Sequence, residues 1–82
     1  MGRSSRSRPK KLGRKLKQIR LSLGLTQAEM AEKVKAKGEA VYAASVSQYE
    51  RGLREPSLLV LLRYSRLSEV TMEMLVDDQL EF

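Results

Sequence analysis

The chain has 82 residues, of which 16 are Lys or Arg and 10 are Asp or Glu, so its formal charge is +6. This length allows one small domain with a single core, and the excess of positive charge favours a polyanionic partner. Cysteine and histidine are absent, which excludes disulfides and zinc fingers and removes the most common general base. We therefore expect neither an enzyme nor a bound cofactor or metal.

Positive charge is concentrated at the beginning of the chain. Nine of the 16 basic residues lie within residues 1–20, which contain no acidic residue, whereas residues 70–82 contain four acidic residues and no basic one. Residues 1–8 have too few apolar side chains to fold, so we expect a disordered arm there, then a folded domain over 9–78 and a tail over 79–82. The arm is either a solubilising tail or a segment that contacts phosphates.

The first two folded segments have clear helical signals. Four apolar residues recur at spacings of four, three and four, which predicts an amphipathic helix after Pro9 that ends at Gly24: Leu12, Leu16, Ile19 and Leu23. Thr26 and Glu29 then have the spacing of a capping box, with Leu25 and Met30 placed as a hydrophobic staple. This second helix is expected to continue to a stop near Gly38.

Three further helices are predicted after a turn at residues 35–40. The third covers residues 43–50, where Val46 and Tyr49 face inward and the remaining side chains are small and polar. A fourth follows Pro56 with an inner stripe of four residues, namely Leu58, Leu61, Leu62 and Ser65. Thr71 can cap a short fifth helix from Met72 to about Asp77. No alternating pattern predicts a strand, so the expected fold is all-α with five helices.

Three blocks of sequence resemble the phage-repressor or Xre type of helix-turn-helix domain. They are LGLTQAEMA at residues 23–31, SVSQYERG at 45–52 and REP at 54–56, in that order. A capping box alone would be weak evidence, because it begins many unrelated helices. The resemblance extends over about residues 12–77 and implies a compact, five-helix, lambda repressor-like domain. In that family the third helix lies in the major groove of double-stranded DNA.

The resemblance places the base-contacting positions on the third helix, at Ala43, Ala44, Ser47 and Gln48. Gln48 is the strongest candidate, because its amide can bond to adenine through two atoms; the alternative is an ordinary surface glutamine. Ala43 and Ala44 could contact a thymine methyl group; the alternative is that alanine occurs there only because of its high helix propensity. Ser47 could bond to a base or to a phosphate.

Phosphate contacts are expected around this helix. Gln27 lies in the first turn of the second helix, where N–H groups and the positive dipole end suit a phosphate. The other candidates are Lys35, Lys37, Tyr42, Ser45, Arg51 and Arg54. The alternative for Tyr42 is that it covers the edge of the core, and the alternative for Arg51 and Arg54 is a solvated loop. Arg20 and Glu50 occupy positions that pair in the family, and such a pair would orient the third helix; the alternative is two solvated charges.

The spacing departs from the family pattern in one place. Fourteen residues separate Val34 from Tyr49, where the family has about nine, the length of its tight turn and helix start. About five extra residues are therefore expected in the turn, around residues 35–41, and the start of the third helix is less firmly placed than Gln48. Glu69 stands where a left-handed glycine is common.

The sequence thus predicts a transcriptional regulator, most simply a repressor, that binds double-stranded DNA as a homodimer on a two-fold related operator. Six apolar residues are candidates for the dimer contact or for packing within the monomer: Val70, Met72, Leu75, Val76, Leu80 and Phe82. A second possibility keeps the fold but makes it an adaptor for a protein partner, with only non-specific nucleic-acid binding. The longest apolar run, residues 58–62, is far shorter than the ~20 residues that cross a bilayer, so we expect no membrane and a cytoplasmic protein of prokaryotic or phage type.

Overall fold

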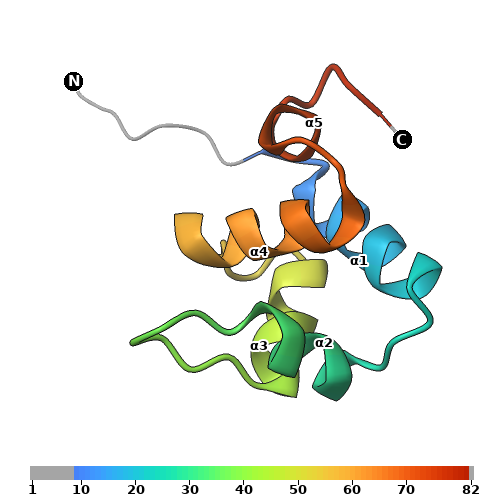
Figure 1. The fold of residues 1–82 in the computed structure, drawn as a ribbon. Helices are drawn as coiled ribbons and strands as arrows, with labels where there is room; N and C mark the ends of the chain where they lie inside the picture. Colours follow the sequence, from blue (N-terminus) through green and yellow to red (C-terminus); the bar gives the residue numbers. More distant parts are fainter. Residues whose placement is uncertain (1–8, 82) are drawn as a thin grey trace.

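The computed structural model describes residues 9–81, so the expected arm at residues 1–8 and the expected dimer residue Phe82 lie outside the described residues. Within residues 9–81 the chain forms five helices (Figure 1), which confirms the all-α prediction: α1 (Leu12–Ser22), α2 (Gln27–Val34), α3 (Ala43–Glu50), α4 (Leu58–Ser68) and α5 (Met72–Val76). None of these helices is long and apolar enough to cross a bilayer.

Short side chains cap three of the helices at their first turn. The predicted capping box is present, because the Thr26 hydroxyl accepts a bond from the Glu29 N–H at 3.1 Å while the Glu29 carboxylate accepts one from the Thr26 N–H at 2.9 Å. Ser57 and Thr71 accept N–H bonds in the same way, at 3.2 and 3.1 Å, and so begin α4 and α5. These local bonds explain why the helix starts could be placed from sequence.

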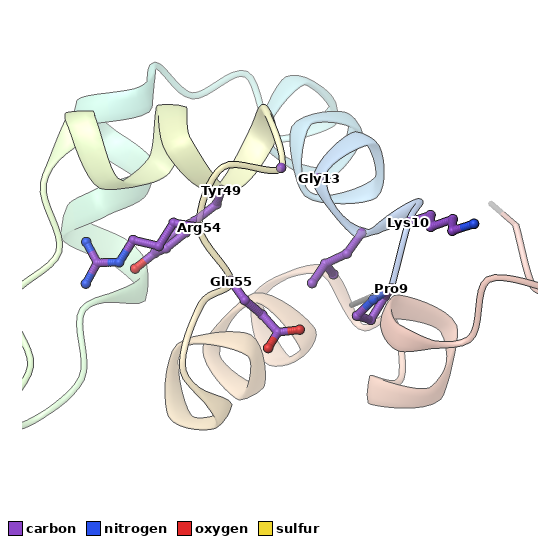
Figure 2. A pocket seen from close by; sticks show the side chains of 8 residues that line it. Pro9, Lys10, Gly13, Tyr49, Arg54 and Glu55 are labelled. Carbon is purple, nitrogen blue, oxygen red and sulfur yellow. The ribbon is translucent and has the colours of Figure 1, made fainter. Parts of the chain in front are cut away.

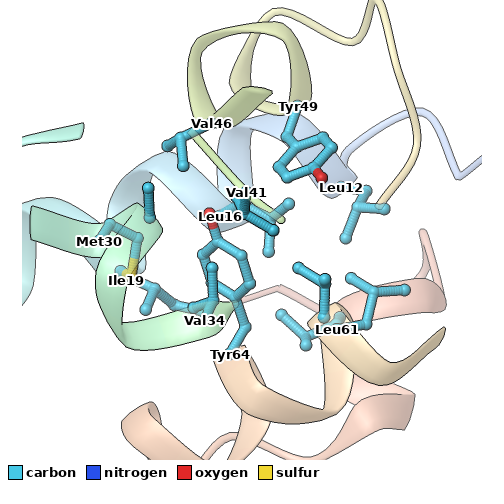
Figure 3. Close-up of a cluster of buried hydrophobic side chains, with 13 residues drawn as sticks. Leu12, Leu16, Ile19, Met30, Val34, Val41, Val46, Tyr49, Leu61 and Tyr64 are labelled. Atoms are coloured by element: carbon cyan, nitrogen blue, oxygen red, sulfur yellow. The ribbon is translucent and has the colours of Figure 1, made fainter. Parts of the chain in front are cut away.

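The core takes side chains from all five helices and from the loop before α3 (Figure 3). Its buried apolar members are Leu12, Leu16, Ile19, Met30, Ala31, Val34, Val41, Val46, Tyr49, Val60, Leu61, Tyr64 and Leu75. The stripe predicted for α1 is buried except at its last residue, since Leu23 is 39% exposed. The inward positions predicted for α3, Val46 and Tyr49, are both buried.

Helix α4 buries a different stripe from the predicted one. Leu58 is 72% exposed, whereas Val60, Leu61 and Tyr64 are buried. The prediction for Leu58 was wrong because residues 58–62 are all apolar, and a continuous apolar run fits any helical phase. Packing against the rest of the core, and not the local pattern, selects the buried face.

Helix α2 ends at Val34, before the expected stop at Gly38. Residues 35–42, which we call the insertion hairpin, turn back on themselves through a bridge between Ala36 and Glu39, with the Glu39 N–H donating to the Ala36 carbonyl at 2.9 Å. Gly38 has a φ of 81° and forms the tip of this hairpin instead of the end of a helix. The extended turn that the spacing predicted is therefore present.

Helix α1 is joined to α5 through a buried lysine. Lys15 is 1% exposed, and its ammonium group donates to the carbonyls of Met74 at 2.6 Å and Asp77 at 2.9 Å. Met74 lies in the last turn of α5 and Asp77 is its C-cap, where helix geometry leaves carbonyl groups without intrahelical partners. Lys15 therefore serves the fold, although the sequence shows it only as one of many basic residues near the N-terminus.

Candidate nucleic-acid interface

Helices α2 and α3 pack against each other and form the unit that the helix-turn-helix resemblance predicts (Figure 1). Ala31 on α2 is 3% exposed and Val46 on α3 is fully buried. The small Ala31 side chain lets the two backbones approach closely. Because the inner faces are used in this way, the opposite face of α3 is left for a ligand.

The four predicted base-contacting residues share this opposite face of α3. Ala44 is exposed, and Ala43, Ser47 and Gln48 are half-buried. Helical geometry places positions 43, 44, 47 and 48 on one side, because positions 43 and 47, like 44 and 48, are four residues apart and so lie one turn apart on the same face. The side chains of Ser47 and Gln48 make no hydrogen bond with any other residue in the described part of the chain. Their polar groups are therefore available to a bound molecule.

The C-terminal end of α3 is fixed by the predicted ion pair. Arg20 Nε donates to Glu50 Oε2 at 2.6 Å and Arg20 Nη2 donates to Oε1 at 3.1 Å, with side chains only 11% and 3% exposed. Arg20 Nη1 also donates to the Leu25 carbonyl at 3.0 Å. The hydrogen bonds to Glu50 raise the pKa of Arg20 above its ordinary value. The pair joins α1, the turn before α2, and α3.

Gln27 adds a third partner to this cluster. Its side-chain Nε2 donates to Glu50 Oε1 at 3.2 Å, so its amide already has a protein partner. Sequence reasoning placed Gln27 at the start of α2, where the structure has it, but did not connect it to Glu50. The backbone N–H groups of the first turn of α2 thus lie beside the cluster that positions α3.

A close contact between backbones reinforces the same junction. A Cβ atom added to Gly13 of α1 would lie 2.7 Å from the Glu50 carbonyl oxygen and 2.8 Å from that of Tyr49. Figure 2 shows Gly13 beside the end of α3, at a small cavity that Pro9, Tyr49 and Arg54 also line. Sequence reasoning missed this role, although a glycine inside a helical pattern is a signal of close packing.

Apart from Gln27, described above, the predicted phosphate-contacting residues are exposed to solvent with one exception. Tyr42, at 67% exposure, and the exposed Lys37, Arg51 and Arg54 have accessible side chains. The exposed Lys35 is paired with Glu32 at 3.0 Å. The Arg54 guanidinium lies 5.9 Å from the centre of the Tyr49 ring, so that ring orients it (Figure 2).

Ser45 is the exception, and its predicted phosphate contact is corrected. Its side chain is 6% exposed, and its hydroxyl accepts a hydrogen bond from the Tyr42 N–H at 3.2 Å. Ser45 therefore stabilises the first turn of α3 from inside the protein. A side chain that is 6% exposed offers little surface to a phosphate.

The predicted dimer residues divide into buried and exposed ones. Leu75 is fully buried in the core, which corrects its assignment to a dimer contact, because it has no surface to offer. Val70 and Met72 are partly buried against the core, and Leu80 is half-buried. Val76 is 41% exposed and lines a groove with Leu58. The exposed α4 residue Leu58 was not foreseen at this surface.

The C-terminal segment binds the start of α1. Asp78 accepts hydrogen bonds from the backbone N–H groups of Lys10 at 2.9 Å and Lys11 at 3.0 Å. Glu81 pairs with Lys11 Nζ at 3.0 Å and with Arg14 Nη2 at 2.7 Å. Backbone bonds lower the pKa of Asp78, and the bond from Lys11 lowers that of Glu81. The N-terminus of α1 has no cap of its own, so Asp78 supplies one from the other end of the chain.

Comparisons with known proteins agree with this geometry. Residues 16–75 match the family model HTH_3, described as helix-turn-helix. The crystal structure of the P22 c2 repressor in complex with the synthetic operator 9T, in the presence of Tl+, is similar at a TM-score of 0.69 and 27% sequence identity. The similarity covers 82% of this chain and 94% of that one. No curated protein sequence matches the chain.

Proposed function

Because this chain belongs to the lambda repressor-like helix-turn-helix family, we propose that it is a transcriptional regulator, most simply a repressor, that reads double-stranded DNA with α3. The observation that carries the proposal is the asymmetry of α3. One end is fixed by the buried Arg20–Glu50 pair, while its outer face presents Ser47 and Gln48, whose side chains have no hydrogen-bond partner among residues 9–81. The similarity to a repressor bound to an operator supports the same function.

The dimensions and side chains of α3 suit the major groove. A helix with its side chains is about 10–12 Å across, and the groove is about 12 Å wide. Ala43 and Ala44 leave the start of α3 narrow, so its backbone can approach the base edges closely. Gln48 then supplies the donor and acceptor that adenine requires, and Ser47 adds a hydroxyl.

Phosphate contacts position α3 on the duplex. The proposed ones come from the start of α2 with Gln27, from Tyr42, from Arg51 and Arg54, and from Lys35 and Lys37 on the insertion hairpin. All except Gln27 are exposed. Contacts of this kind fix the register of the protein without reading sequence.

The protein acts as a homodimer on two half-sites about 34 Å apart in this proposal. The described candidates for the contact are the exposed Val76 and the partly buried Val70, Met72 and Leu80. The groove shared by Val76 and Leu58 gives this end of the molecule an apolar surface that a second copy could cover. Phe82, the last predicted member of the contact, lies two positions after Leu80 in the sequence.

The test is selection of bound sequences from a randomised duplex library at physiological salt, with the native protein and with Gln48→Ala. We expect a two-fold related motif for the native protein, and a loss of about 1–3 kcal/mol of discrimination at one base pair per half-site for the variant. Gln79→Ala removes an exposed amide outside α3 and should retain the full motif.

If the native protein selects no motif, the result supports the second candidate function, an adaptor for a protein partner. The exposed leucines favour it, since Leu53, Leu58 and Leu59 are 62%, 72% and 54% exposed. In that case the native protein would bind duplexes weakly, with no enriched motif and with a steep fall as salt rises. Enrichment of a motif that Gln48→Ala loosens would reject it.

A further inference from the structure

The insertion hairpin is anchored to the core on both legs, although it is an addition to the usual turn. Ala36 on its first leg is 8% exposed and Val41 on its second leg is 4% exposed, so both legs are anchored by burial. The bond from the Glu39 N–H to the Ala36 carbonyl, at 2.9 Å, closes the loop between the anchors. A loop fixed in this way can hold a side chain in a defined place at little entropic cost.

A side-chain bond fixes the hairpin to α4. The Glu39 carboxylate accepts a hydrogen bond from the Ser57 hydroxyl at 2.6 Å, across 18 residues of sequence. The same Ser57 oxygen caps α4 by accepting from the Val60 N–H at 3.2 Å. Glu39 therefore joins the hairpin to a helix start that is itself anchored in the core.

The tip of the hairpin presents one basic side chain. Lys37 is exposed, and it makes no hydrogen bond or ion pair with any other residue of the described range 9–81. Lys35, at the base of the first leg, is instead paired with Glu32. Of the two hairpin lysines, Lys37 is thus the one whose charge is available to a ligand.

The hairpin also lies beside the part of the molecule that would enter the groove. Its second leg leads directly into Tyr42 and the start of α3, and Figure 1 shows it projecting sideways from α2 and α3. Tyr42 lies five positions after Lys37, which at about 3.3 Å per extended residue limits the separation of their backbones to about 16 Å. A helix in a major groove about 12 Å wide has phosphate strands within that reach.

We propose that the insertion hairpin is a second DNA-contacting element, in which Lys37 binds a backbone phosphate beside the groove and Glu39 is the positioning residue that holds it there. This inference rests on the proposed function. It narrows the hairpin contact to Lys37 and gives Glu39, an acidic residue, a favourable effect on binding to a polyanion. Simple charge repulsion predicts the opposite, because the negative charge of Glu39 would then weaken binding to DNA.

The first experiment measures affinity for the selected operator across a range of salt concentrations, for the native protein, Lys37→Ala and Arg66→Ala. Both variants remove one exposed positive charge, but Arg66 lies on α4. We expect Lys37→Ala to weaken binding to all duplexes by a similar factor and to lower the salt slope by about 1, as loss of one phosphate contact does. Arg66→Ala should keep the native slope.

The second experiment compares Glu39→Gln with Glu39→Ala. Both remove the negative charge, but the glutamine keeps an oxygen that can accept from the Ser57 hydroxyl. We expect Glu39→Ala to bind the operator more weakly than Glu39→Gln, and this difference should disappear when Lys37→Ala is also present. That loss of additivity distinguishes positioning of Lys37 from a general loss of stability.

The outcomes separate this inference from the proposed function. If the native protein selects no motif, the proposed function itself is wrong. If it selects a motif but Lys37→Ala keeps the affinity and salt slope of Arg66→Ala, Lys37 does not bind a phosphate and the inference is overturned. If Lys37→Ala has the expected effect but Glu39→Ala and Glu39→Gln bind equally, the positioning role of Glu39 is overturned.

Discussion

Helix α1 takes part in two clusters of charge that differ in their exposure to solvent. Near its C-terminus, Arg20 and Glu50 form a bidentate pair with side chains 11% and 3% exposed. Near its N-terminus, Lys11 and Arg14 pair with Glu81, and all three side chains are between 36% and 57% exposed. The first cluster positions α3, whereas the second attaches the C-terminal segment.

The difference in exposure determines how much each cluster contributes to the stability of the fold. Charges removed from water lose their hydration, so each requires its partner, and removing one leaves the other buried and uncompensated. Exposed pairs gain little, because water and salt screen them and both side chains lose freedom. We therefore expect the orientation of α3 to depend strongly on Arg20, and the C-terminal segment to depend on its backbone hydrogen bonds more than on its ion pairs.

Removing the buried pair should have the largest effect. Arg20→Ala leaves the Glu50 carboxylate with Gln27 as its remaining side-chain partner, so we expect a loss of about 3 kcal/mol in the free energy of unfolding, measured by urea denaturation. Operator binding should weaken as well, because α3 loses its attachment. The matched control is Arg14→Ala, which breaks an exposed pair and should cost less than about 1 kcal/mol. Equal losses in the two variants would show that burial does not distinguish the clusters.

A substitution at Gly13 tests how closely α1 approaches α3. Gly13→Ala should stabilise an isolated helix by about 1 kcal/mol. Here its Cβ would meet the Glu50 and Tyr49 carbonyls at 2.7 and 2.8 Å, and such overpacking costs about 1–3 kcal/mol. We expect the variant to be less stable than the native protein and to bind the operator more weakly.

The control for this substitution is Gln18→Ala, which changes an exposed position of the same helix and should alter stability by less than about 0.5 kcal/mol. Thermal or urea denaturation measures the stability of both variants relative to the native protein. A Gly13→Ala protein that is more stable than the native one would mean that the helix propensity of alanine outweighs the cost of the close contact. It would also mean that α1 and α3 can move apart to accommodate the added Cβ.

Features formed by residues close in sequence could be predicted from sequence. The capping box of Thr26 and Glu29 needs only a spacing of three, and the outward face of α3 follows from helical periodicity together with Val46 and Tyr49. The Arg20–Glu50 pair spans 30 residues, and only the family resemblance suggested it.

Features decided by tertiary packing could not be predicted in the same way. Leu58 and Val60 are equally apolar, and only their neighbours in the fold expose one and bury the other. Ser45 is as polar as Ser47, yet it lies against the core and bonds to the Tyr42 N–H. Asp78 meets Lys10 across 68 residues, and no local pattern predicts that an acidic tail residue caps the first helix.

The attachment of the C-terminal segment to α1 through Asp78 gives the smallest expected effect, and a change of pH reveals it. The Lys10 and Lys11 N–H groups lower the pKa of Asp78 in the folded protein, so this carboxylate stabilises the fold when it is ionised. Its contribution is fully present above the unfolded-state pKa of about 3.9 and is lost as pH falls through the lower folded-state pKa. Asp78→Asn should therefore unfold more easily than the native protein at neutral pH, with the difference shrinking below about pH 4.

Urea denaturation of both proteins from pH 7 to about pH 2.5 measures this difference. Glu73→Gln serves as the control, because it removes an exposed carboxylate of α5 whose side chain has no hydrogen bond or ion pair within the described residues. Its difference from the native protein should stay smaller than that of Asp78→Asn at neutral pH. If the gap between Asp78→Asn and the native protein were constant across the whole range, ionisation of Asp78 would not be what holds the C-terminal segment to α1, and the N–H bonds would contribute without its charge.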